Sequence, residues 1–440
     1  MTSQRRQPPD RGIPLERLLE RFCRYVRINT QADEKATVYP SSPGQLELGR
    51  LLLGELRDLG LRDAVMDRHG IIMATVPGNL AAYPPVVAWI AHLDTSPETS
   101  GANVQPIVHR SYDGRDIVLP GNPSQVLRPL DNPELAACVG KTIITTDGTT
   151  LLGADDKAGV AVIVEAAAYL MAHPEVPRGP IRICFTCDEE IGRGVDHLDL
   201  RQLGADVAYT LDGRGVGEID TETFSADLAI VTLHGVNIHP SIAKGRMVNA
   251  LRLAGNFIRR LPPELSPERT ADREGFLHPY RIEGGVAEVT LRILLRDFET
   301  ARLAEQAQLL RDIARTVETE EPGGRIDIQV TPQYRNLAEG LAKEPRAVAL
   351  AEEAMRRAGV TPRRTSVRGG TDGSRLTELG LPTPNLSTGE HNLHSPLEWT
   401  CLEEMATAVH VLVELARLWS AESAAPPADA AARADSPSVG

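Results

Sequence analysis

The segment Leu151–Gly159 places two adjacent carboxylates, Asp155 and Asp156, between two glycines and directly before a helix-like apolar run that ends at His173. Paired acids at a glycine-flanked turn are unsuited to a hydrophobic core and suited to holding a cation. Alone, the segment would more simply be a solvated turn with a capping aspartate. Three further segments change this balance, because each is an apolar run that ends in acids or histidines: Val86–Asp94, Ile181–Glu190 and Asp206–Asp212. Together the four segments predict a metal-centred enzyme.

The same apolar runs predict the fold class. Each is typical of a strand buried on both faces, and helical patterns lie between them. Strands that alternate with helices predict an α/β fold with a mostly parallel sheet, in which ligands bind at the carboxyl ends of the strands. The chemically active side chains occupy those ends: His92, Asp94, Glu189, Glu190 and Asp212.

The chain length of 440 residues favours two domains. Near residue 222 the pattern changes to alternating strands and two amphipathic helices, and the α/β pattern resumes near residue 332. We therefore expect a catalytic domain in two segments, 13–221 and 332–420, with a compact α+β lid at 222–331 inserted between them. The terminal segments 1–12 and 421–440 are rich in small, polar and proline residues and are predicted to be disordered.

Composition excludes several partners. The net charge of -13 speaks against nucleic acid and anionic membranes, and no apolar run approaches the roughly 20 residues that span a bilayer. The N-terminus lacks the apolar region of a signal peptide, and the five scattered cysteines suggest reduced thiols, so we expect a cytoplasmic protein.

A bridging role for Asp155 between two divalent cations would require further ligands. The candidates are His92, Glu190, Asp212 and His394, and imidazole and carboxylate both suit zinc, cobalt or manganese. Three carboxylates, two neutral imidazoles and one hydroxide balance two divalent ions in formal charge. Glu189 then remains as a general base for a metal-bridged water, and the predicted reaction is hydrolysis of an amide.

The motifs at these positions resemble a known family. His92-Leu93-Asp94-Thr95, Gly153-Ala154-Asp155-Asp156-Lys157, Asp188-Glu189-Glu190 and Leu211-Asp212-Gly213 are similar to those of the dizinc peptidases that include carboxypeptidase G2 and peptidase T. Further similarity is found at Thr145–Gly148, Asn237–Pro240, Ala243–Gly245, Met247–Leu251, Arg296–Phe298 and Arg368–Gly373. The resemblance is collinear from about residue 15 to 418, and as a set the motifs are specific.

The resemblance implies a metal-dependent aminopeptidase that acts on tripeptides, with a ferredoxin-like lid. It implies two zinc ions, one held by His92, Asp155 and Asp212 and the other by Asp155, Glu190 and His394. It implies Glu189 as the base and Asp94 as the residue that orients His92. The implied substrate contacts are His239, Asn249, Arg296 and Arg368, and pairing through the lid would give a homodimer.

Three departures from the family pattern concern substrate preference more than metal binding. Cys187 replaces a proline before the acidic triplet, and Ser241 replaces a glycine after His239-Pro240. The stretch His391-Asn392-Leu393-His394-Ser395 replaces an aromatic-Asn-aromatic-His-Gly pattern, so His394 keeps the place of the ligand but His391 is a nearby rival. Two other functions remain open at this point. One is a different amidohydrolase of the same fold, such as a dipeptidase, carboxypeptidase or N-acyl amino acid deacylase, and the other is a metal-containing peptide-binding protein without turnover.

Overall fold

The computed structural model describes residues 12–81 and 83–423, which form two compact units. The first unit comprises the described residues through Thr221, Gly340–Thr365 and the described residues from Gly380 onward; the second comprises Glu222–Glu339 and Ser366–Leu379. The terminal residues 1–11 and 424–440, within the segments predicted to be disordered, lie outside the described residues. No helix in the described part of the chain is long and apolar enough to cross a membrane.

The first unit is built on one mixed sheet. Nine of its strands follow one another along the sheet in the order β1 (Val65–Met66), β2 (Ile72–Val76), β8 (Ile181–Thr186), β3 (Val87–His92), β9 (Val207–Arg214), β16 (Asn385–His391), β17 (Trp399–Cys401), β7 (Ile143–Thr145) and β4 (Ile107–His109). Beside this row, β10 (Glu218–Thr223) pairs with β16 and with β15 (Arg363–Val367). The four central strands β8, β3, β9 and β16 are parallel, whereas the flanking pairs are antiparallel. The predicted α/β class with a parallel sheet centre is confirmed.

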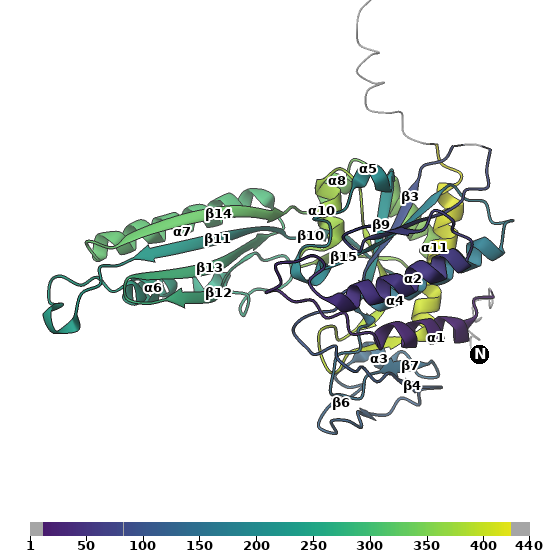
Figure 1. The fold of residues 1–440 in the computed structure, drawn as a ribbon, viewed down its shortest axis with the longest axis horizontal. Coiled ribbons are helices and arrows are strands. Elements are labelled where there is room, and N and C mark those ends of the chain that lie inside the picture. The colour runs from purple at the N-terminus through teal and green to yellow at the C-terminus, as the bar shows by residue number, and fades with distance from the viewer. Residues whose placement is uncertain (1–11, 82, 424–440) are drawn as a thin grey trace, which may run out of the picture. The chain divides into compact units, whose positions relative to one another are not determined.

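Helices surround this sheet (Figure 1). The longer ones are α1 (Leu15–Val26), α2 (Pro43–Asp58), α4 (Ala154–Ala172), α9 (Arg346–Arg357) and α11 (Leu402–Trp419), and shorter ones are α3 (Pro133–Ala136) and α5 (Leu200–Leu203). Helix α4 is buried along almost its whole length, because it packs on β3 and β9 on one side and on α1 and α11 on the other. This apolar helix therefore anchors the Asp155 turn firmly in the core.

The second unit has the element order β11 (Ser225–His234), α6 (Ala250–Arg259), β12 (Phe276–Gly284), β13 (Glu288–Asp297), α7 (Thr300–Glu320) and β14 (Arg325–Tyr334). Its sheet is antiparallel in the order β12-β13-β11-β14. Alternate apolar residues of β11 and β13 share one core with the apolar faces of α6 and α7. This β-α-β-β-α-β arrangement is ferredoxin-like, as predicted.

Two local details differ from the sequence predictions. Glu189 and Glu190 do not end a strand but form the short 3-10 turn Glu189–Ile191 after β8. Asp212 lies inside β9 rather than after it. Helix α6 starts at Ala250, because the side chain of Asn249 caps it by accepting a hydrogen bond from Leu251 N at 2.9 Å.

Candidate active site

The carboxylate of Asp155 contacts two imidazoles at once. Its Oδ1 lies 3.0 Å from Nε2 of His92, and its Oδ2 lies 3.2 Å from Nε2 of His394. His92 is the last residue of β3, Asp155 is the second residue of α4, and His394 lies in the loop after β16. Three segments far apart in sequence thus meet at a single buried carboxylate, which is 7% exposed.

Two further carboxylates complete the cluster. Asp212 Oδ1 lies 3.8 Å from Nε2 of His92, and Glu190 Oε2 lies 3.1 Å from Nε2 of His394. The ligand atoms of His92, Asp155 and Glu190 lie within 4.8 Å of one another. The other oxygen of Glu190, Oε1, is buried and has no hydrogen-bond partner among the described residues. The five residues named as metal ligands from the sequence are therefore brought together.

The electrostatics of the cluster show an excess of negative charge. Burial, together with the charge of Asp155, raises the pKa of Glu190 to about 8, and the same two causes raise the pKa of Asp212 to about 6. Glu390 and Asp156 are also fully buried beside these groups, and burial with the neighbouring carboxylates raises their pKa values well above the ordinary range. Like charges gathered in a core this way are costly unless a cation joins them.

The imidazoles respond in the opposite sense. Burial disfavours the charged ring of His394, but Asp155 and Glu190 outweigh it and raise its pKa to about 11. For His92, too, burial is outweighed by hydrogen bonds to carboxylates, which raise its pKa well above the usual value. In the metal-free protein, both rings therefore carry protons that must leave before the ring nitrogens can bind metal ions.

Asp94 links one imidazole to the acidic turn. Its carboxylate accepts hydrogen bonds from the backbone N–H groups of Glu189 and Glu190, both at 3.0 Å. Its Oδ1 lies 3.4 Å from Nδ1 of His92, and its backbone carbonyl accepts from the same nitrogen at 3.1 Å. A proton held on Nδ1 leaves Nε2, which faces Asp155, available to a metal ion.

Three other buried side chains hold the backbone of the cluster. Asn385 accepts from the backbone N–H of Asp212 at 3.1 Å and donates to its carbonyl at 2.6 Å. Asp156 accepts from the backbone N–H of His92 at 2.9 Å, and Glu398 accepts from three backbone N–H groups between Leu152 and Asp155. The sequence singled out Asp156 as one of the paired acids but predicted this role for none of the three, because hydrogen bonds to distant backbone atoms leave no pattern in the sequence.

His391, the rival ligand, lies elsewhere. It is buried, stacks on Trp399 with ring centroids 3.7 Å apart, and contacts Glu404 through Nε2 at 2.9 Å. Glu404 also accepts from Cys138 and from Lys141, both at 3.4 Å. His391 therefore belongs to this separate polar network, and His394 is the histidine beside Asp155.

Two of the predicted substrate contacts lie together in the second unit. Arg296 donates to the backbone carbonyl of Arg368 at 3.4 Å, and both guanidinium groups lie against the ring of Phe276, at 5.9 and 5.5 Å. Arg368 is held by Thr270 and by the carbonyl of Glu274. The Nε atoms of both arginines are buried without a hydrogen-bond partner among the described residues.

His239 and Asn249 occupy other segments of that unit. His239 is exposed and lies next to Ser241, whose backbone N–H donates to its Nδ1 at 3.2 Å. Its Nε2 is consequently the nitrogen that carries the proton and can donate to a ligand. Asn249 uses its side-chain oxygen as the cap of α6, so part of its function is structural.

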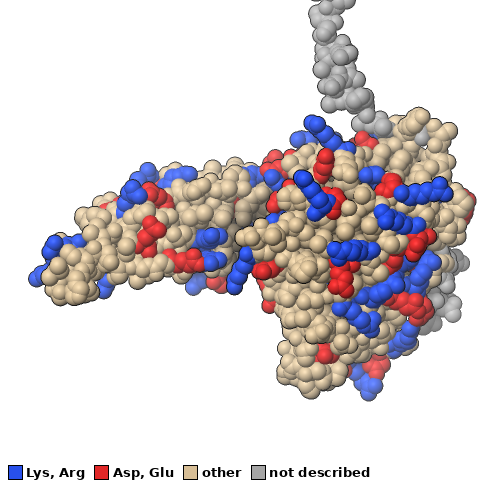
Figure 2. Space-filling model, viewed as in Figure 1, with Lys and Arg blue, Asp and Glu red and all other residues tan. Residues whose placement is uncertain are grey.

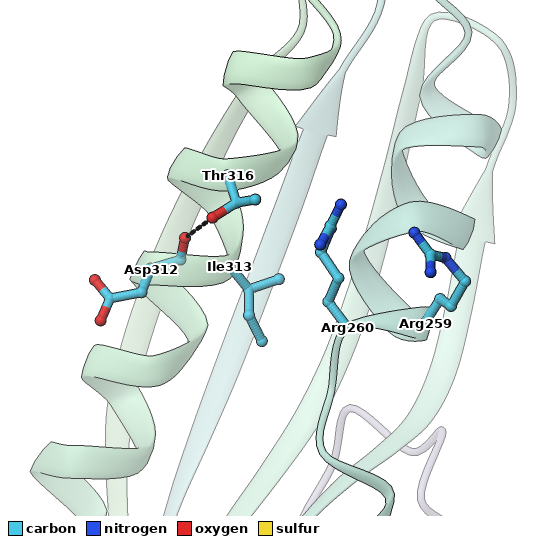
Figure 3. A pocket seen from close by; sticks show the side chains of 5 residues that line it. All are labelled: Arg259, Arg260, Asp312, Ile313 and Thr316. Carbon is cyan, nitrogen blue, oxygen red and sulfur yellow. Dashed lines mark hydrogen bonds between the residues drawn. The ribbon is translucent and has the colours of Figure 1, made fainter.

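A cavity away from this cluster has no comparable group of potential metal ligands among the described residues. A hollow of about 390 Å³ in the second unit is lined by Arg259, Arg260, Asp312, Ile313 and Thr316. Figure 3 shows these side chains on α7 and at the end of α6, with the Thr316 hydroxyl donating to the backbone carbonyl of Asp312. Among the described residues, no group of His, Cys, Asp and Glu that could hold a metal includes a residue of this hollow. On the visible face in Figure 2, acidic and basic side chains are interspersed, without one extended basic surface.

A second hollow, of about 550 Å³, adjoins the cluster through one residue. It is lined by residues 29 and 31–35 with Pro97 and Glu98, and Glu98 Oε2 lies 3.2 Å from Nδ1 of His394. Glu98 thus connects this hollow to the cluster of His, Asp and Glu side chains in the first unit.

Comparison with known proteins agrees with this geometry. Residues 147–418 match the model of peptidase family M20/M25/M40. Peptidase T of Listeria monocytogenes is 43% identical over 404 residues, which cover 92% of this chain and 98% of the relative. Peptidase T of Geobacillus kaustophilus is 44% identical over the same length and coverage.

Solved structures share the fold. A tripeptidase from Staphylococcus aureus superposes with a TM-score of 0.73 at 24% identity, covering 93% of this chain and 99% of that chain. A dinuclear metal binding peptidase of the M20 family from Bacillus subtilis gives a TM-score of 0.61 at 15% identity, covering 92% and 98%. The chain thus belongs to peptidase family M20/M25/M40, alongside the peptidase T enzymes that its motifs at His92, Asp155 and Glu190 resemble.

Proposed function

We propose that this chain is a metal-dependent aminopeptidase that releases the N-terminal residue from tripeptides. The observation that carries the proposal is the buried carboxylate of Asp155, which contacts His92 with one oxygen and His394 with the other. The substrate class follows the relatives, which are named peptidase T and include a tripeptidase of the same fold.

The residues around Asp155 fit two divalent cations. An unpartnered buried oxygen on Glu190, and carboxyl groups with raised pKa values, mark a donor set with too few positive charges. We assign His92, Asp155 and Asp212 to one ion and Asp155, Glu190 and His394 to the other. Zinc suits this mixture of imidazole and carboxylate, and cobalt or manganese could substitute. When bound, such ions acidify water, polarise a carbonyl and stabilise the oxyanion of an attacked amide.

The chain's own residues supply proton transfer and orientation. We assign Glu189 as the general base that takes the proton from the attacking water and delivers it to the leaving amine. Asp94 holds the backbone of Glu189 and keeps the ring of His92 in one tautomer, so it positions both groups without reacting.

The second unit is proposed to act as a lid that holds the peptide. Arg296 and Arg368 form a cationic pair against an aromatic ring, which suits the C-terminal carboxylate of a short peptide. His239 offers an Nε2 donor to a substrate carbonyl, and Asn249 is assigned a further backbone contact. A homodimer formed through this unit is also proposed, with sedimentation as its test.

A small substrate panel tests the proposal. The purified protein loaded with zinc or cobalt is expected to remove the first residue of a tripeptide, to act poorly on a dipeptide and on an N-acetylated tripeptide, and to lose activity with a chelator. Cleavage confined to the C-terminal residue would place the enzyme among carboxypeptidases, and preferred cleavage of the acetyl group would make it a deacylase. Full activity after removal of all metal would overturn the proposal.

A further inference from the structure

Glu398 is a buried carboxylate outside the set of ligands, and its side chain accepts hydrogen bonds from the backbone of the segment that carries the shared ligand. Its Oε2 accepts from the N–H groups of Leu152 and Gly153 at 2.7 and 2.8 Å, and its Oε1 accepts from Asp155 N–H at 3.1 Å. The residue is 1% exposed. A carboxylate that accepts hydrogen bonds with both oxygens holds a loop more firmly than a neutral acceptor would, because hydrogen bonds to a charged acceptor are stronger.

The turn needs such a partner because of its own sequence. Helix α4 begins after Gly153, which has a left-handed φ of 79° and no side chain with which to cap the helix. The N–H groups of Leu152 and Gly153 precede α4, and Asp155 near its start has non-helical backbone angles, so none of these three N–H groups belongs to a regular helical turn. Glu398 accepts hydrogen bonds from all three and holds this turn from a distant part of the chain, 243 residues after Asp155.

Glu398 also lies four residues after His394, and this spacing links two sides of the cluster. The side chain of Asp155 contacts His394 at 3.2 Å, while its backbone N–H is held by Glu398. The distance between two donors on either side of one ion is therefore set by the short segment from His394 to Glu398. We propose that Glu398 is a positioning residue, which holds Asp155 at metal-binding distance from His394 and so sets the affinity for the ion between them.

The inference rests on the proposed metal-dependent function, and the Glu398→Gln variant tests it. Glutamine keeps the size of the side chain but replaces one acceptor oxygen with an NH₂ donor. Either Asp155 N–H or the pair from Leu152 and Gly153 then faces another donor. Loss of a residue that supports a metal ligand typically lowers metal affinity about 10–100-fold.

The matched control is Glu403→Gln. Glu403 also caps a backbone N–H, that of Thr142 at 2.9 Å, and it lies five residues from Glu398. Its partner segment carries none of the proposed ligands. A general effect of losing a capping carboxylate in this region would appear in both variants, whereas a specific effect on the cluster would appear in Glu398→Gln alone.

The experiment measures zinc affinity by competition with a chromophoric chelator, together with thermal unfolding and tripeptide hydrolysis. For Glu398→Gln we expect one of two zinc ions to bind about 10–100-fold more weakly. Activity should be regained when zinc is added in excess, a rescue that a merely unfolded variant would not show. Glu403→Gln should bind zinc as the wild-type protein does.

The inference would be overturned if Glu398→Gln bound both zinc ions as tightly as the wild-type protein does. It would also be overturned if Glu403→Gln lost as much zinc affinity as Glu398→Gln. If Glu398→Gln does not fold, Glu398→Asp takes its place, since the shorter carboxylate cannot reach all three N–H groups. Unchanged zinc affinity in Glu398→Asp would likewise overturn the inference. A wild-type protein that binds no zinc or hydrolyses no peptide would instead refute the proposed function, so the two failures are distinguishable.

Discussion

Metal binding is expected to expel protons from the cluster around Asp155. In the metal-free protein at pH 7, His394 with a pKa of about 11 carries a proton, and so does His92, whose pKa is also well raised. Glu190, with a pKa of about 8, is about nine-tenths protonated, whereas Asp212, with a pKa of about 6, has mostly lost its proton. The ligands must be deprotonated to bind metal.

The expected magnitude is a release of at least about three protons per chain at pH 7, counted over the coupled cluster as a whole. If the four ligands His92, His394, Glu190 and Asp212 had ordinary pKa values, they would release only about half a proton. Each of the two imidazoles would then be about one-quarter protonated at this pH, and both carboxylates would already be deprotonated. Three protons correspond to a free energy of metal binding that becomes more favourable by about 4 kcal/mol per pH unit, shared between the two ions.

Calorimetric titration of the metal-free protein with Zn²⁺ measures this number directly. The titration is repeated in buffers that differ in ionisation enthalpy, and the slope of the observed enthalpy against buffer enthalpy gives the protons released. The Glu190→Gln variant is the control and should release about one proton fewer. A release of half a proton or less in the wild-type protein would refute the electrostatic account of the cluster.

Three further outcomes are expected. Asp94→Asn keeps the shape of the side chain but turns an amide donor toward one backbone N–H of the acidic turn. We therefore expect kcat/KM to fall about 10–100-fold in kinetic assays and the free energy of unfolding to fall by about 1–3 kcal/mol in urea. Wild-type values of both would contradict the role of Asp94. Glu189→Gln should keep its full metal content by elemental analysis while kcat falls at least about 100-fold, and unchanged turnover would exclude Glu189 as the base. Finally, Glu190 of the folded metal-free protein keeps a proton up to about pH 8, whereas in the unfolded chain it loses this proton above its ordinary pKa of 4.5. The free energy of unfolding should therefore decline between about pH 4.5 and pH 8, by up to about 1.4 kcal/mol per pH unit. Urea unfolding in the presence of a chelator measures this, and a free energy of unfolding that rises across this window would contradict the assignment.

The sequence predicted the sheet and the convergence of the cluster because both follow from simple periodic rules. His92 and Asp94 lie two residues apart at the end of a buried strand, and parallel strands bring such ends to one edge of a sheet. Asp155 was recognisable only together with the other three segments, because alone its turn would more simply be a solvated one with a capping aspartate. The strand ends indicated His92, Glu190 and Asp212, whereas the choice of His394 over His391 came from the resemblance to the family and not from a local rule.

Details of the loops did not follow from periodicity. Glu190 reaches the cluster from a 3-10 turn rather than from a strand end, because Asp94 draws the turn inward through two backbone N–H groups. The capping role of Glu398 was not predicted, since a glutamate between a loop and a short strand has the same sequence appearance as a solvated one. Likewise, the contacts that distinguish His391 from His394, its stacking on Trp399 and its contact with Glu404, did not follow from the sequence.

The central claim is that Asp155 shares its carboxylate between two metal ions. A crystal structure of the zinc-loaded protein, with anomalous data collected at the zinc edge, tests it most directly. Two anomalous peaks about 3.5–4 Å apart are expected, one on each side of the Asp155 carboxylate, with His92 at one peak and His394 at the other. A single peak, or peaks that Asp155 does not contact, would contradict the claim.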